Sequence, residues 1–178
     1  MSGHNKWAQI KHKKATTDAK KGKVFSKLAK AISVAARGNP DPATNVRLKT
    51  EVERAKAVNM PRENIERAIR RVSDRDAAAL QEVYLEFIGP GGVGIIVAAV
   101  TDNSNRTINE LRQLASKQNA RMAGQGSILW MFHRSGQEFV PSTPYPLTDP
   151  VQQAQLEEFL SALDEHDDVQ EVFTNADY

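Results

Sequence analysis

Lysine and arginine are the residues whose number and spacing point most directly to a chemical role. Ten of the first 38 residues are Lys or Arg, against one acid, Asp18. Such cations contact phosphates, and a ring such as that of Trp7 can stack on an unpaired base. The candidate nucleic-acid-binding residues are Lys6, Trp7, Lys11, Lys13, Lys14, Lys20, Lys23, Lys27, Lys30, Arg37, Arg67, Arg70 and Arg71. A solvated charged face is the structural alternative, but a one-sided basic stripe beside a basic tail favours phosphate binding.

The charge is divided unevenly along the chain. The net charge of the 178 residues is only +2, yet residues 1–75 hold 19 Lys/Arg and 7 Asp/Glu, whereas residues 76–178 hold 5 and 15. Basic segments attract polyanions, while acidic bodies stay soluble, repel nucleic acid or dock on a basic surface. We therefore expect a basic nucleic-acid-binding domain over 1–75, with a flexible N-terminal tail, and an acidic domain over 76–178. The charge pattern does not separate DNA from RNA.

No other group of residues has the spacing of an active site or a metal site. Cysteine is absent, and the histidines at 4, 12, 133 and 166 lack the spacing of zinc ligands. The acidic run 164–168 is interpreted as a solvated turn, with His133 and His166 structural or solvated. The glycine-rich run 89–94 is interpreted as a hairpin turn rather than a phosphate loop, because a strand follows it. We expect no catalytic residue, cofactor, metal or small-molecule substrate.

The sequence also predicts where the protein works. Its longest apolar run, Val93–Val100, is far shorter than the roughly 20 residues of a membrane-spanning helix. No secretory signal is visible, and the lack of cysteine suits a reducing compartment. We therefore expect a cytoplasmic protein that does not enter a membrane, and we favour a monomer.

Helices are expected to position the basic residues. Apolar periodicity predicts helices over 18–37 and 42–58, and a third that begins at Pro61. Asp41 is the expected cap of the second helix, with Pro42 at its first position. In the first helix the lysine stripe (Lys20, Lys23, Lys27 and Lys30) lies opposite the apolar residues, and in the third the three arginines lie away from the inward side chains.

Strands dominate the rest of the chain. The pattern predicts strands over 82–88 and 94–101, a helix over 107–119, a hairpin of 127–133 with 137–140, a helix over 151–164 and a strand over 169–174. Trp130, Met131 and Phe132 are interpreted as a strand buried on both faces. The predicted fold is α+β: a basic three-helix domain, then an antiparallel-sheet domain of order ββαββαβ, divided near residues 73–79.

Six segments of the chain, in order, resemble the YebC/PmpR family. They are Ser2-Gly-His-Asn-Lys-Trp7, Gly22-Lys-Val-Phe-Ser-Lys-Leu28, Asn59-Met-Pro-Arg-Glu-Asn-Ile-Glu-Arg-Ala-Ile69, Gly89-Pro-Gly-Gly-Val-Gly94, Thr101-Asp-Asn-Ser-Asn-Arg-Thr107 and Asp167-Asp-Val-Gln-Glu-Val172. The family includes the mitochondrial translational activator of cytochrome c oxidase subunit I. The resemblance implies a helical domain followed by two α+β domains in a non-enzymatic cytoplasmic protein.

The resemblance leaves two functions open. Family members are described as DNA-binding transcriptional regulators, and also as ribosome-associated factors that help translation; a protein–protein adaptor is a third hypothesis. The absence of a clear recognition helix and dimer seam tilts the physical argument toward RNA or the ribosome. Only ten residues, 141–150, separate the predicted hairpin from the last helix, so we expect the third domain to be missing.

Overall fold

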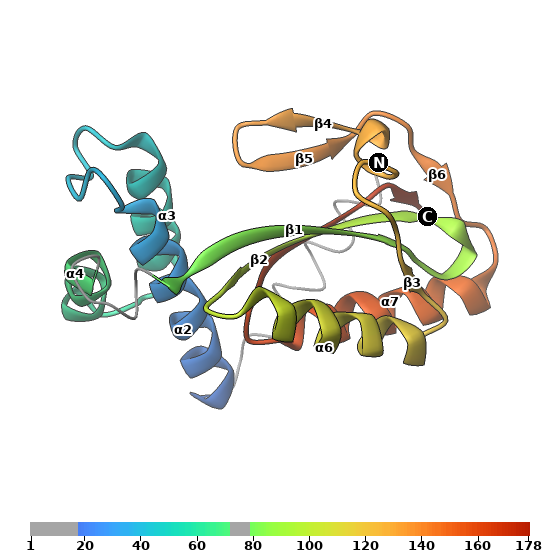
Figure 1. The fold of residues 1–178 in the computed structure, drawn as a ribbon, viewed down its shortest axis with the longest axis horizontal. Coiled ribbons are helices and arrows are strands. Elements are labelled where there is room, and N and C mark those ends of the chain that lie inside the picture. Colours follow the sequence, from blue (N-terminus) through green and yellow to red (C-terminus); the bar gives the residue numbers. More distant parts are fainter. Residues whose placement is uncertain (1–17, 72–78) are drawn as a thin grey trace. The chain divides into compact units, whose positions relative to one another are not determined.

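The computed structural model describes residues 18–71 and 79–178, and Figure 1 shows its ribbon. Two compact units are distinguished by their internal contacts: a helical unit within residues 16–83, joined by 100–104, and a sheet unit formed by 84–99 and 105–178. No helix in the described ranges is long and apolar enough to cross a membrane. The predicted division near residues 73–79 falls partly outside the described residues and stays a prediction.

Within the described residues, the helical unit contains the three helices that the apolar periodicity predicts. They are α2 (Asp18–Ala35), α3 (Val46–Ala57) and α4 (Arg62–Arg70). The side chains that they bury against one another are Ile32, Ala35, Ala36, Leu48, Val52, Ala55, Met60, Ile65 and Ala68. The Ser33 hydroxyl also donates to the carbonyl oxygen of Ala68 over 2.9 Å, which joins α2 to α4 without leaving a buried polar group unpaired.

The predicted start of the second helix is wrong. This helix begins at Val46, and Asn45 is its N-cap: the Asn45 carboxamide oxygen accepts from the Leu48 amide over 3.0 Å. The Asn45 amide nitrogen also donates to the Ala35 and Asn39 carbonyl oxygens. Asp41, the expected cap, instead accepts from the Ala43 amide within the connecting loop. Asn45 is the better cap because one side chain satisfies the start of α3 and the end of α2 together.

A four-stranded sheet is the centre of the sheet unit. Its spatial order is β3 (Arg121–Met122), β1 (Gln81–Ile88), β2 (Gly94–Thr101) and β7 (Val169–Thr174). Strands β2 and β7 pair antiparallel from Ile95 opposite Thr174, and the register shifts between Ala98 and Ala99. The predicted strands are confirmed here, whereas two-residue β3 was not predicted because so short a strand carries no alternation.

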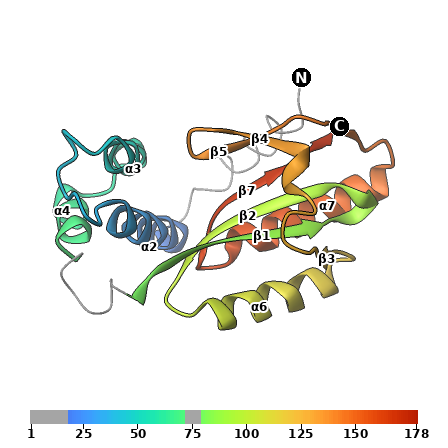
Figure 2. The same ribbon diagram turned by 45° about the horizontal axis from the view of Figure 1, so that its top comes forward.

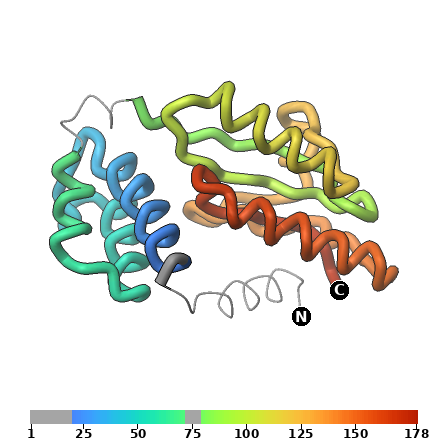
Figure 3. Tube along the Cα trace, turned by 90° about the horizontal axis from the view of Figure 1, so that it is seen from below, coloured from blue at the N-terminus to red at the C-terminus, as the bar shows by residue number. Residues whose placement is uncertain are grey.

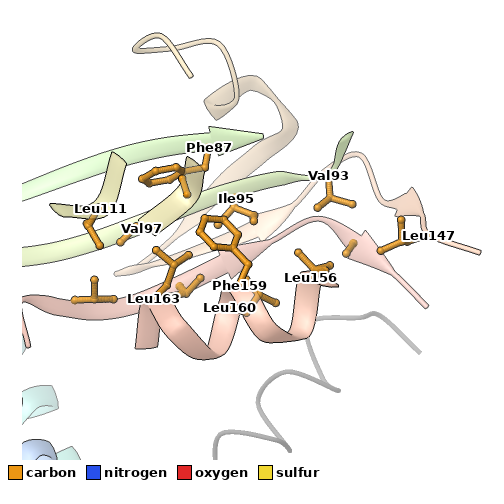
Figure 4. Packing of buried hydrophobic residues seen from close by; sticks show 14 residues of the cluster. Phe87, Val93, Ile95, Val97, Leu111, Leu147, Leu156, Phe159, Leu160 and Leu163 are labelled. Carbon is orange, nitrogen blue, oxygen red and sulfur yellow. The ribbon is translucent and has the colours of Figure 1, made fainter. Parts of the chain in front are cut away.

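In the described part of the chain, two helices cover one face of this sheet. Figure 3, which views the molecule from below, shows α6 (Ser104–Lys117) and α7 (Pro150–Glu165) side by side in front of the strands. Asp149 caps α7 by accepting from the Val151 amide over 2.9 Å, so that Pro150 occupies the first helical turn without needing an amide. The core between helices and sheet contains Phe87, Val93, Ile95, Val97, Leu111, Leu147, Leu156, Phe159, Leu160 and Leu163 (Figure 4).

The other face of the sheet is covered by a hairpin, as Figure 2 shows. Its strands are β4 (Phe132–Ser135) and β5 (Glu138–Pro141), and it packs on the sheet through an edge-to-face contact between Phe139 and Phe173 with ring centroids 5.4 Å apart. Two further strands of two residues, β6 (Tyr145–Pro146) and β8 (Ala176–Asp177), pair in parallel and were not predicted. The α+β fold with an antiparallel sheet is confirmed.

The expected core strand through Trp130 is wrong. Residues 129–131 form a 3-10 turn, η3 (Leu129–Met131), and the Trp130 side chain is 64% exposed. Its indole nitrogen donates to the Ser127 carbonyl oxygen over 2.8 Å. The buried Glu86 carboxylate fixes this loop by accepting from the amides of Gly126, Ile128 and Leu129. Three backbone amides drawn to one carboxylate require a turn, which explains why the strand begins only at Phe132.

Candidate nucleic-acid interface

The lysine stripe of α2 is exposed at the N-terminal end of the helix and half-buried further along. Lys20 and Lys23 are exposed, while Lys27 and Lys30 are half-buried nearer the core. Burial rises along the helix because its C-terminal half is packed between α3 and α4: Ile32 is fully buried, whereas Leu28 is only partly buried. The long aliphatic stems of lysine can lie on such a half-buried surface while the ammonium groups reach water.

Several arginines of the helical unit are held by the protein itself. The Arg37 guanidinium donates to the Leu80 carbonyl oxygen, and Arg47 forms an ion pair with Glu82. Arg37 is one of the predicted nucleic-acid contacts, and its role stays a prediction. Its bond to a carbonyl oxygen occupies only part of the five-donor set of the guanidinium group.

The arginines of α4 are arranged differently. Arg67, Arg70 and Arg71 are exposed, on the side of α4 opposite the buried Ile65. Among the residues that the structure describes, none forms an ion pair or hydrogen bond with the side chains of these three arginines. Their guanidinium groups are therefore available to a ligand. The neighbouring Arg62 is different, because its Nε lies 2.7 Å from Glu66 Oε1 one turn along the helix.

Five of the predicted contacts belong to the N-terminal segment of the chain. Lys6, Trp7, Lys11, Lys13 and Lys14 lie outside the described residues, so their part in the interface stays a prediction. Sequence reasoning also missed two exposed lysines of α3, Lys49 and Lys56. Their spacing of seven residues places them on one side of α3, and this helical period was the signal that could have found them.

A buried acid lies behind the basic surface. Glu51 of α3 is 5% exposed, and its Oε2 lies 3.5 Å from a guanidinium nitrogen of Arg54. Burial raises the pKa of the Glu51 carboxyl above its usual range, while the positive charges of Arg54 and Arg47 act in the opposite direction. Desolvation prevails because the carboxylate is almost wholly removed from water.

A second group of ionisable residues lies in the sheet unit, where α6 approaches the turn before β7. Glu110, His166 and Asp168 offer one ligand atom each, all within 4.8 Å of one another. His166 Nε2 lies 3.0 Å from Glu110 Oε2, and buried Asp168 accepts from Arg106 and from the Thr107 hydroxyl, each over 2.8 Å. The acidic run before β7 is thus not wholly a solvated turn, because the fold buries Asp168.

This cluster is arranged as an ion-pair network rather than as a metal site. The Asp168 amide donates to His166 Nδ1 over 3.2 Å, so the ring proton belongs on Nε2 and points at Glu110. A metal bound through Nε2 would require the opposite tautomer and would break this contact. Arg106 also occupies the position of a cation between the two carboxylates. The network joins α6 to the turn between α7 and β7.

Glycines of the glycine-rich run pack closely against neighbouring side chains. Gly91 has φ +76° within the short η2 turn (Pro90–Gly92), and a Cβ on it would lie 2.3 Å from Leu147 Cδ1. A Cβ on Gly89 would lie 2.7 Å from Ile95 Cδ1. The Gly94 amide donates to the Asn175 side chain over 2.7 Å. The predicted turn between β1 and β2 is confirmed.

Two family models match the chain. The N-terminal domain model of the TACO1/YebC protein matches residues 5–75, and the model of the TACO1/YebC second and third domain matches residues 80–138 and 135–176. The two pieces of the second match meet within the β4–β5 hairpin. The matches together cover most of the chain, including both units.

Curated relatives agree with this assignment. Proteins named "Probable transcriptional regulatory protein" are 43% identical over 99% of this chain in Pseudothermotoga lettingae and 53% identical over 76% in Thermotoga maritima. One from Trichlorobacter lovleyi is 49% identical over 76% of the chain. The matched part spans 71%, 54% and 56% of the length of these three relatives. All three relatives are therefore longer than the part that matches, and two of them are nearly twice as long.

A solved structure shares the fold. The crystal structure of a conserved hypothetical protein from Aquifex aeolicus superimposes with a TM-score of 0.86 at 31% identity, and the match covers 96% of each chain. The expected loss of a third domain stays a prediction, with the length of the curated relatives in its favour and the coverage of this structure against it. The two family-model matches and the full-length relative at 43% identity together show that the chain belongs to the TACO1/YebC family.

Proposed function

We propose that this protein is a non-enzymatic, cytoplasmic regulator of gene expression that binds DNA through its helical unit. The observation that carries the proposal is the number of exposed cations on the helices of that unit. Lys20 and Lys23 are exposed on α2, and Arg67 and Arg70 are exposed on α4. Cations gathered on a rigid helical scaffold provide the electrostatic contacts that dominate nucleic-acid affinity. The relatives' name, "Probable transcriptional regulatory protein", supports the transcriptional part of the proposal.

The sheet unit is proposed to contribute no phosphate contacts. Residues 76–178 hold 15 acids against 5 basic residues, so this part of the chain repels a polyanion at long range. Its buried acids are engaged within the protein, Glu86 with loop amides and Asp168 with Arg106. This unit therefore has the character of a body that stays soluble or docks on a basic partner.

The test is the salt dependence of binding by the full chain. Fluorescence anisotropy with a labelled duplex should give an affinity that falls steeply with salt: about five phosphate contacts predict a log–log slope near −4 to −5. Changing Lys20 and Lys23 together to Glu should reduce the steepness by about one per lysine. The matched control changes Lys117 and Arg121, exposed in the sheet unit, to Glu for the same change in net charge.

Two results would end the proposal. A slope near zero between low and physiological salt excludes binding driven by phosphates. An equal loss of affinity in the control and in the α2 variant means that total charge, and not the helical surface, determines binding. Thermal unfolding of both variants should stay close to that of the parent, because substitutions on exposed surfaces change stability by about 0.5 kcal/mol or less.

A second candidate function is a ribosome-associated translation factor that contacts ribosomal RNA. The lysine stripe favours it, because ammonium groups are point charges that bind the phosphates of RNA as readily as those of DNA. Crosslinking in cells, followed by sequencing of bound DNA and RNA together, separates the two. Recovery of one ribosomal RNA region without promoter enrichment supports the translation factor, whereas promoter peaks without ribosomal RNA support the transcriptional regulator.

A further inference from the structure

Helices α3 and α4 of the helical unit are joined in the manner of a helix-turn-helix. Four residues, 58–61, separate α3 from α4, and Asn59 in this turn has φ +59°, the left-handed conformation that reverses the chain sharply. The Asn59 and Met60 amides donate to the Lys56 and Ala55 carbonyl oxygens over 2.9 and 3.0 Å. In Figure 1, α4 is seen end-on while α3 is seen from the side, so the two helices cross steeply.

Packing fixes this arrangement. Met60 of the turn is 6% exposed and belongs to the same apolar cluster as Leu48 of α3 and Ile65 of α4. Two steeply crossed helices joined by a short turn are the arrangement that presents the second helix to the major groove of DNA. The turn is therefore a rigid connection that sets the direction in which the outer side of α4 faces.

The outer side of α4 carries groups suited to reading bases. At 100° per residue, Glu63, Arg67 and Arg70 lie opposite Ile65, and Arg71 follows at the helix end. The three guanidinium groups have no partner among the described residues, in contrast to Arg37, Arg47, Arg54 and Arg62 of the same unit, which each contact a protein acceptor. Glu63 would repel phosphates, so this side is poorly suited to binding the DNA backbone alone.

We infer that α4 is a recognition helix that enters the major groove of duplex DNA, with Arg67 and Arg70 reading guanine. The inference rests on the proposed DNA-binding function and deepens it by naming the element that would confer sequence preference. The major groove of B-form DNA admits an α-helix, and the planar guanidinium group binds guanine O6 and N7 in a bidentate manner. The deep, narrow major groove of an RNA helix excludes side chains, so this arrangement suits DNA rather than duplex RNA.

The two basic helices then have different tasks. The lysines of α2 supply phosphate contacts, which position the protein without reading sequence. The arginines of α4 supply base contacts, which discriminate one sequence from another. The difference between the two cation types supports this division, because an ammonium group is a point charge whereas a guanidinium group has two parallel donors in one plane.

The experiment begins with selection of preferred duplexes from a random DNA library by the full chain at one fixed salt concentration. Affinities are then measured for the selected duplex and for a scrambled duplex of equal length. Arg67→Lys and Arg70→Lys keep the charge but remove the bidentate geometry. Each should weaken binding to the selected duplex by roughly 5- to 150-fold for every guanine that is no longer read, with little change for the scrambled duplex.

The matched control is the double variant Lys20→Gln with Lys23→Gln, which should weaken binding to both duplexes by a similar factor. Because all four positions are exposed, unfolding temperatures of the variants should match the parent. The inference is overturned if tight binding yields no enriched sequence, or if the two arginine variants leave the ratio of the two affinities unchanged. A parent that binds no duplex at all instead removes the proposed function, which is a distinct result.

Discussion

The two units use their charged residues in opposite ways. In the helical unit, Arg67 and Arg70 are exposed on α4 and have no acidic partner among the described residues. The same unit carries the lysines of α2. In the sheet unit, Glu86 and Asp168 are buried and each accepts several hydrogen bonds from the protein itself. The arginines of α4 are available to a ligand, whereas the buried carboxylates of the sheet unit maintain the fold.

This difference separates binding from stability. Exposed cations can be removed with little effect on folding, since their removal leaves no buried group unpaired. Removal of a buried carboxylate leaves backbone amides without an acceptor, at a cost of about 1–3 kcal/mol. Variants of the helical surface should therefore change affinity alone, and variants of buried residues in the sheet unit should change stability alone.

The largest expected effect concerns the core of the sheet unit. Phe159 of α7 is fully buried and meets Phe87 edge-to-face with ring centroids 6.0 Å apart. Phe159→Ala should lower the free energy of unfolding of the sheet unit by about 3–5 kcal/mol. Hydrogen exchange read residue by residue should show faster exchange in α7 and β2, and unchanged protection in α3.

The control for this variant is Val151→Ala, on the same helix but 64% exposed, which should change stability by no more than about 0.5 kcal/mol. Equal acceleration of exchange in α3 by Phe159→Ala would mean that the units unfold together. The contrast between a binding unit and a separately stabilised body would then be wrong.

A smaller effect is expected at Glu86. Glu86→Gln places a carboxamide, with only one acceptor oxygen, against the amides of Gly126, Ile128 and Leu129. The sheet unit should lose roughly 1.5–3 kcal/mol, measured by denaturant unfolding. Glu138→Gln, an exposed change of the same chemistry on β5, is the control. Equal stability of the two variants would show that the buried carboxylate does not hold the Trp130 loop.

Neutralising the buried acid of α3, Glu51, should stabilise the helical unit, whereas neutralising Glu86 should destabilise the sheet unit. Burial raises the pKa of Glu51 above the value in the unfolded chain, so the folded state binds the proton more tightly. The stabilisation that comes from protonated Glu51 is fully present below the pKa that this carboxyl has in the unfolded chain. It is lost as the pH rises through the pKa that the carboxyl has in the folded protein. At neutral pH the ionised group is thus unfavourable, and Glu51→Gln should stabilise the helical unit, by less than Glu86→Gln destabilises the sheet unit.

The measurement is thermal unfolding between pH 4 and pH 8. The advantage of Glu51→Gln over the parent should grow with pH, whereas Glu53→Gln, exposed on the same helix, should show no such trend. A stabilisation that is greatest at low pH would contradict the expected sign and would mean that the attraction of Arg54 outweighs burial.

The smallest effect is expected on the surface of α4. Arg62 and Glu66 lie one turn apart along the helix and form an ion pair, and the Arg62 side chain is 91% exposed. A double-mutant cycle with alanine at both positions should give an interaction energy of about 0.3–0.5 kcal/mol that declines with added salt. A coupling energy above about 1 kcal/mol would show that exposed charges also stabilise the helical unit. The contrast between charges that serve binding in one unit and stability in the other would then be wrong.

Local patterns in the sequence predicted the longer elements well. Helix α2, strands β1, β2 and β7, and helix α7 follow apolar periods that extend over many residues. The start of α3 was missed because Asp41-Pro42 has the form of a cap followed by a first-turn proline. Only the fold shows that Asn45 can reach the end of α2 as well as the start of α3.

The candidate site was less accessible to sequence reasoning. The period of α2 predicted one lysine stripe, but Lys27 and Lys30 of that stripe are half-buried. The contacts of Arg37 with Leu80 and of Arg47 with Glu82 join residues 43 and 35 positions apart. The network of Glu110, His166 and Asp168 likewise forms only when α6 meets the turn before β7. Such contacts depend on tertiary structure, which no local spacing encodes.

The pairing of β7 with β2 has a consequence for how the protein is made. Strand β2 ends at Thr101, and its antiparallel partner begins at Val169, close to the last described residue. During synthesis, the contacts within α2, α3 and α4 become available early, because they join near neighbours in the chain. The apolar residues of β2 stay exposed until α7 and the partner strand β7 have been synthesised. A nascent chain therefore holds a completed basic domain beside an unfinished sheet, the form in which chaperones would first meet it.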